Sequence, residues 1–214
     1  MRSNAELGRG GRARGGHVAQ AFLRDVRAPA PARLPIFRSR LQGELLARLL
    51  LGPEREMSML DLAVMLHTDL ASVMREVERL ARAGILVLRR TMSGRLVRRD
   101  ADGPLYEPLA HLLMLTFGPA AVVAEEFGRL PSVRELHLFG AWAERYEHPL
   151  GVHPADVEVL IIGHLTPDVA FDTAQLAAAR LALPVHPVVR TPAQWRDDND
   201  PFLREIRNGP LIAL

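Results

Sequence analysis

Residues 37–99 contain three apolar runs with helical spacing, followed by two short runs that favour strands. In the first run leucine recurs every three or four residues, which predicts a helix that Gly52 and Pro53 end. Ser58 then precedes a second apolar run, and Asp61 stands three residues later, close to the spacing of a capping box. A second helix is therefore expected directly after Ser58.

A third helix and a hairpin should complete this region. The helix begins after the polar turn at 67–69 and ends at Gly84. Residues 85–91 and 95–99 predict two strands joined by a tight Ser-Gly turn. The side chains expected to face inward from the third helix are those of Leu70, Val73, Met74, Val77, Leu80 and Ala81.

The order of these elements is that of a winged helix-turn-helix. The segment at 77–86, which reads VERLARAGIL, resembles the end of the recognition helix and the start of the wing in ArsR-like bacterial regulators. The resemblance covers about residues 37–100 and implies a DNA-binding transcription regulator. Winged helices also serve as dimerisation or protein-binding modules, which is the alternative function of this region.

The third helix would enter the major groove of DNA with its N-terminal half. Its outward residues include Arg75, whose guanidinium can pair bidentately with guanine, and Ser72, which with Thr68 could hold phosphates. Glu76 and Arg79 share that face, and the alternative for this face is a set of solvent-exposed ion pairs. In the hairpin the candidates for contact with the DNA backbone or minor groove are Arg89, Arg90, Arg95, Arg98 and Arg99.

The charge balance changes along the chain, although the net charge is only +2. All 27 basic residues are arginine. Residues 1–35 hold seven arginines and two acids, residues 36–104 hold 12 arginines and nine acids, and residues 105–214 hold eight arginines and 14 acids. A basic front half suggests a polyanion such as double-stranded DNA as its partner, and ordinary solvated charged faces are the alternative.

Four parts are expected along the chain: a flexible basic arm at 1–35, the winged helix at 36–104, linking helices at 105–130 and a second domain at 131–214. The linking helices are the expected interface of a homodimer. The sequence has no cysteine, which excludes disulfides and thiolate metal sites. No apolar run approaches the roughly 20 residues that cross a bilayer, so we expect no membrane contact and a cytoplasmic location.

The second half carries a different pattern. A strand at 135–139 runs into Gly140, and after a loop Asp156 and Glu158 open an apolar run. A strand that ends in a glycine turn, followed by Asp-x-acid on a later strand, resembles the minimal nucleotidyltransferase domain of the polymerase-beta superfamily. The resemblance covers about residues 119–214. The expected fold class is therefore α+β, with a winged helix-turn-helix followed by a small mixed-sheet α/β domain.

Two carboxylates two residues apart on a strand point to the same face, so Asp156 and Glu158 can share Mg²⁺. The resemblance implies that a nucleoside triphosphate would lie against Gly140, Ala141 and Trp142. Trp142 is more simply a packing residue beneath that cleft. This pair of ligands and the glycine turn together would make the candidate metal and nucleotide site.

Three departures from the nucleotidyltransferase pattern predict a degenerate domain that at most binds metal or nucleotide. The spacer before Asp156 is long, and Ala141 lacks the hydroxyl of the usual Gly-Ser turn. The strand expected at 185–189 offers His186 where active relatives carry a third carboxylate. The alternative is an active, antitoxin-like nucleotidyltransferase that modifies a protein or small molecule with Mg²⁺ and a nucleoside triphosphate. His153 is expected in a solvated loop beside these carboxylates.

Regulators that join a winged helix-turn-helix to a nucleotidyltransferase-like domain resemble the chain over most of its length. The segments at 190–195 and 200–203, which read RTPAQW and DPFL, belong to that resemblance. The sequence therefore predicts a sequence-specific DNA-binding transcription regulator.

Overall fold

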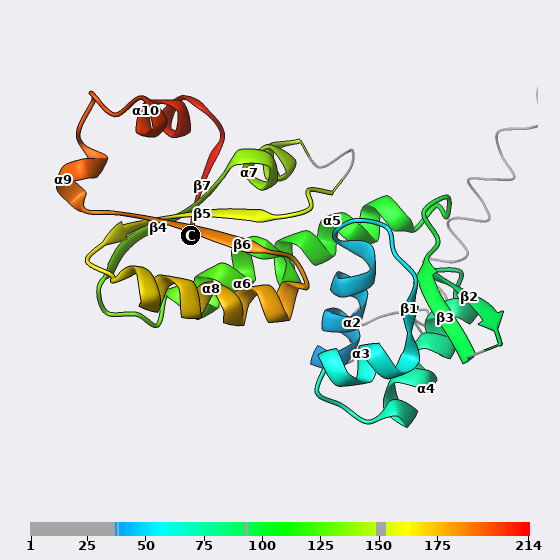
Figure 1. Ribbon diagram of the computed structural model, residues 1–214. Coiled ribbons are helices and arrows are strands. Elements are labelled where there is room, and N and C mark those ends of the chain that lie inside the picture. Colours follow the sequence, from blue (N-terminus) through cyan, green and yellow to red (C-terminus); the bar gives the residue numbers. More distant parts are fainter. Residues whose placement is uncertain (1–36, 38, 93, 149–152) are drawn as a thin grey trace, which may run out of the picture. The chain divides into compact units, whose positions relative to one another are not determined.

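Residues 39–214 form one compact unit, and the account below concerns that unit (Figure 1). The predicted basic arm at 1–35 lies outside the described residues. The residues that this computed structural model describes are 37, 39–92, 94–148 and 153–214.

The first half of the unit has the predicted order of helices and hairpin, with one added short strand. Its antiparallel sheet has the order β1-β3-β2, and the hairpin register pairs Leu86 with Arg99 and Thr91 with Gly94. The elements are α2 (Arg40–Leu50), β1 (Met57–Ser58), α3 (Met59–Met65), α4 (Leu70–Arg82), β2 (Leu86–Thr91) and β3 (Gly94–Arg99).

Helix ends in this half follow the local sequence. The Ser58 hydroxyl accepts a hydrogen bond from the Asp61 amide at 3.0 Å, which confirms the predicted cap of α3. Helix α4 ends at Arg82, and Gly84 follows with a φ of +70°, as the predicted stop requires. The prediction that Leu70 faces inward is wrong, because its side chain is 41% exposed. Leu70 is the first residue of α4, and a side chain there points back past the N-terminal end of the helix instead of onto the core.

Helices α5 (Tyr106–Phe117) and α6 (Pro119–Phe127) connect the two halves and bury apolar side chains within the chain itself. Helix α5 packs on α2, and α6 packs on α8 (Pro167–Leu181). A Cβ at Gly43 of α2 would lie 2.2 Å from Cζ of Phe117. Glycine at that position therefore lets the Phe117 ring rest against the α2 backbone.

The second half is a four-stranded mixed sheet of order β6-β5-β4-β7, in which only β5 and β6 run parallel. Helices α6 and α8 cover one face, and α7 and α10 cover the other (Figure 1). The observed class is α+β, as predicted. The remaining elements are β4 (Val133–Phe139), α7 (Gly140–Glu147), β5 (Val157–Gly163), β6 (Val185–Arg190), α9 (Pro192–Trp195), α10 (Pro201–Asn208) and β7 (Leu211–Ala213).

Side chains alternate between the two faces of the sheet along the central strands, so every second residue shares a face. Phe139, Leu160 and Ile162 form a buried cluster with Leu203 and Ile206 of α10. Glu158 lies two residues before Leu160 on β5, so its carboxylate points to the same face of the sheet, which α7 and α10 cover. This packing positions the candidate carboxylate site described below.

The expectation that no apolar run approaches the length that crosses a bilayer is wrong: residues 106–127, which span α5 and α6, are long and apolar enough by length and composition. Buried core helices share that property. Within the described part of the chain the side chains of Ala110, Leu113, Val123 and Phe127 are buried.

Candidate functional site

The exposed N-terminal end of α4 carries a small hydrogen-bonded network. Asp69 caps the helix by accepting from the Ser72 amide at 2.8 Å and from the Ser72 hydroxyl at 2.7 Å. The Ser72 hydroxyl also accepts from Arg75 at 2.9 Å. The hydrogen bonds from Ser72 lower the pKa of Asp69, which keeps this cap ionised. Arg75 is thereby held at the exposed surface, while the Ser72 proton already has an acceptor.

Two of the predicted α4 residues are paired with each other. Glu76 and Arg79 form an ion pair and are both half-buried. The alternative prediction for this face is a set of solvent-exposed ion pairs. The structure has such an ion pair here, but it is only partly exposed to solvent. Arg75 is consequently the α4 arginine of the predicted set that stays exposed.

The hairpin register divides the candidate arginines between the two faces of the wing. Arg89 and Arg98 share one face, where they pair with Glu56 and Glu54 of the loop before β1. Arg90 and Arg95 lie directly opposite each other on the other face, together with the buried Val97. The wing therefore presents two different basic surfaces.

Arg90 and Arg95 form a like-charged cross-strand pair close to α4. Arg95 donates to Glu78 of α4 at 2.7 Å, and Arg90 has no carboxylate partner among the described residues. Like charges directly opposite on a sheet are destabilising unless something compensates them. One carboxylate for two guanidinium groups leaves this surface with an excess of positive charge beside α4.

Arg99, also a predicted DNA contact, has a structural role. It donates to the main-chain oxygen of Gly52 at 2.7 Å, and its guanidinium carbon lies 5.1 Å from the centre of the Tyr106 ring. These contacts fix the base of the wing to the end of α2 and the start of α5. Arg99 is therefore unavailable to DNA in this arrangement.

The candidate carboxylate site forms where β4 ends and α7 begins. Gly140 has a φ of +65°, and a Cβ built on it would lie 1.7 Å from Oε2 of Glu158. The carboxylate of Glu158 thus rests on the Gly140 backbone, beside the N-terminus of α7, where a negative charge is favoured. This brings together Gly140 and Glu158 as the sequence predicts.

Asp156 lies one residue before β5 rather than on the strand as expected, and it is paired with a histidine. Its Oδ2 is 3.4 Å from Nε2 of His186 on β6. The described residues contain no group of three or more His, Cys, Asp or Glu side chains placed to hold a metal ion. Within the described chain the two carboxylates therefore have no third carboxylate beside them.

Gly140→Ala tests how closely the carboxylate packs on the turn. We expect a loss of roughly 1–2 kcal/mol from the left-handed backbone alone, and a further loss because the new Cβ displaces Glu158. Urea denaturation of Gly140→Ala, with Glu158→Ala as the matched background, measures both parts. In that background only the backbone cost should remain, so equal losses in the two backgrounds would contradict the close contact.

Helix α7 turns Trp142 and Arg145 into the interior. Trp142 is 1% exposed, so its ring packs inside the fold, and within the described part of the chain its Nε1 has no hydrogen-bond partner. Nη2 of Arg145 lies 3.6 Å from Oε2 of Glu107 and 3.5 Å from Nε2 of His153. Sequence reasoning missed Arg145, whose only sequence signal is its place three residues after Trp142, on the same side of the helix.

His153 is buried, 4% exposed, rather than solvated as expected. Its ring lies 5.9 Å from the Trp142 ring and 6.3 Å from the Tyr106 ring, centre to centre. Burial, followed by the charges of Arg145 and Arg99, lowers the pKa of His153 to about 4. The imidazole is therefore neutral at pH 7 and fills a space between α5 and α7.

No protein-family model matches the chain, and no curated protein matches it. One similar solved structure comes from work on the regulation of DNA binding of Bordetella bronchiseptica BpsR by 6-hydroxynicotinic acid. The identity is 26%, the match covers 53% of this chain and 89% of that chain, and the TM-score is 0.31. A superposition with so low a score does not establish a shared fold.

Proposed function

We propose that this protein is a sequence-specific DNA-binding transcription regulator that reads the major groove with α4 and holds the DNA backbone with the wing. The observation that carries the proposal is the opposed pair Arg90 and Arg95 beside α4, with Arg75 exposed on the helix. A phosphate placed between the two guanidinium groups would relieve their repulsion. Since one recognition helix reads only a half-site, we propose that a homodimer binds DNA.

The test is fluorescence anisotropy with duplexes tiled across the protein's own upstream region, repeated over a salt series. One tile should bind far more tightly than the others, with an affinity that falls steeply as salt increases. Uniformly weak binding to every tile would leave only non-specific charge attraction. That result would overturn the proposal.

Arg75→Ala should reduce the preference for the cognate tile over the others. A bidentate arginine–guanine pair contributes about 1–3 kcal/mol of discrimination, so the ratio of affinities should fall about tenfold or more. The matched control is Arg82→Ala, which removes an exposed arginine from the C-terminal end of the same helix. If Arg75→Ala left the preference unchanged, α4 would not read bases through this residue.

A second candidate function follows from the contact between Glu158 and Gly140, which brings together two parts of the nucleotidyltransferase pattern. We propose that this site binds metal or nucleotide but does not transfer a nucleotidyl group, because Asp156 pairs with His186 and β6 carries no acidic residue. Incubation with Mg²⁺ and labelled ATP, beside an Asp156→Asn control, tests this. Label transfer that depends on Asp156 would establish an active nucleotidyltransferase instead.

A further inference from the structure

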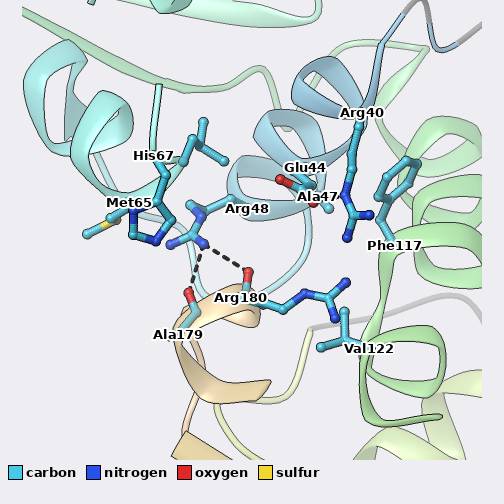
Figure 2. A pocket seen from close by; sticks show the side chains of 11 residues that line it. Arg40, Glu44, Ala47, Arg48, Met65, His67, Phe117, Val122, Ala179 and Arg180 are labelled. Atoms are coloured by element: carbon cyan, nitrogen blue, oxygen red, sulfur yellow. Dashed lines mark hydrogen bonds and ion pairs between the residues drawn. The ribbon is translucent and has the colours of Figure 1, made fainter. Parts of the chain in front are cut away.

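A cavity of about 240 Å³ lies between α2, the turn before α4 and the helices α5, α6 and α8 (Figure 2). Its volume is slightly below the range of about 300–1,000 Å³ that is typical of pockets for drug-sized ligands. A compact molecule would therefore fit it better than a nucleotide. The cavity is separate from both the α4 surface and the Glu158 site.

The cavity wall is rich in guanidinium groups. Arg40, Arg48 and Arg180 line it, whereas Glu44 is its one acidic lining residue among those described. Arg40 pairs with Glu44 at 2.6 Å, and Arg180 pairs with both Glu125, at 2.7 Å, and Glu126, at 2.5 Å. Two of the three arginines thus have a carboxylate partner, and the third, Arg48, differs from them.

Arg48 carries a buried charge whose hydrogen-bond acceptors are neutral. The residue is 6% exposed, and its Nη2 donates to the main-chain oxygens of Ala179 and Arg180, both at 2.9 Å (Figure 2). Its Nε is shielded from solvent and has no hydrogen-bond partner among the described residues. A buried cation is costly unless an anion or a full set of hydrogen bonds compensates it, and here both are incomplete.

The rest of the wall is apolar. Ala47, Met65, Phe117 and Val122 line the cavity from α2, α3, α5 and α6. A ligand that matches this wall has one anionic group and a small apolar body. Guanidinium groups bind carboxylates with particularly favourable geometry.

We propose that this cavity binds a small organic acid, with its carboxylate held by Arg48 and its apolar body against Phe117 and Val122. The cavity also borders His67, which lies two residues before the Asp69 cap of α4. Any coupling between the acid and DNA rests on the proposed DNA binding. If the acid changes the protein's affinity for DNA, DNA must change its affinity for the acid by the same factor. Binding of the acid itself does not depend on it.

The experiment is isothermal titration calorimetry of the full chain with benzoate, compared with benzamide, which has nearly the same shape and no charge. Benzoate should bind at least about tenfold more tightly than benzamide. Inorganic phosphate, an anion without an apolar body, should bind more weakly than benzoate. Equal binding of benzoate and benzamide, or no heat from benzoate, would overturn the proposal.

Two variants locate the binding in this cavity. Arg48→Ala should weaken benzoate about tenfold, whereas Arg129→Ala should leave it unchanged, because Arg129 lies outside the cavity. Ala47→Leu fills the cavity without removing a charge and should abolish binding. Benzoate binding that survives Ala47→Leu would place the site elsewhere and overturn the proposal. DNA anisotropy of wild type without benzoate separately tests the proposed function.

Discussion

The double variant Arg90→Ala with Arg95→Ala should lose DNA affinity about a hundredfold, roughly tenfold for each arginine. Each residue is expected to neutralise one phosphate, so the slope of log affinity against log salt should become shallower by about two. The loss should be similar on every duplex, because phosphate contacts carry no base information. Anisotropy over a salt series measures both the affinity and the slope.

Stability distinguishes this explanation from simple damage to the wing. Because Arg90 and Arg95 repel each other in the free protein, the double variant should unfold at the same urea concentration as wild type or a higher one. The matched control is Arg89→Ala with Arg98→Ala, which removes two arginines from the opposite face, where Glu56 and Glu54 already pair with them. An equal loss of DNA affinity in the control would show that the wing face does not matter.

The second large effect is a loss of stability in mild acid. His153 has a pKa lowered to about 4 in the folded chain, against an ordinary value of 6.5. Between these two values the unfolded chain binds a proton that the folded chain does not, so stability falls as the pH falls from about 6.5 to about 4. At about 1.4 kcal/mol for each unit, the loss from this residue reaches roughly 3 kcal/mol.

Urea denaturation at a series of pH values, on wild type and His153→Gln, measures this contribution. The variant should be less stable at pH 7, since His153 fills a buried space, but its stability should change less between pH 6.5 and 4. His148→Gln is the matched control, because His148 is exposed on the neighbouring segment. The same pH slope in wild type and His153→Gln would contradict the assignment.

Longer elements were predictable because their apolar periodicity is local. The helices at 40–50 and 70–82 repeat leucine or valine at helical spacing, and their ends are visible in the sequence. The short elements β1, α9 and β7 were not predictable, since two to four residues carry no period. Helix α7 was missed because its N-terminal residues were assigned to a glycine turn followed by a loop.

The sites were less predictable than the fold, for a physical reason. The hairpin sequence places arginines on both faces of the two strands. Only the loop acids Glu54 and Glu56, which fold back onto the hairpin, show which face is neutralised. Likewise His153 is buried by Trp142 and Tyr106, whose rings reach it from two different helices. Such pairings depend on tertiary contacts that no local pattern encodes.

The link from Arg48 to the end of α8 also has a consequence for how the chain is made. The carbonyl of Ala179 lies 131 residues after Arg48 in the sequence. At a synthesis rate of about 5–20 residues per second, α2 leaves the ribosome of the order of ten seconds before its partner exists. Phe117 is synthesised earlier and can pack on α2 first, but Arg48 lacks its two main-chain acceptors until α8 is made, so this helix completes its packing only near the end of translation.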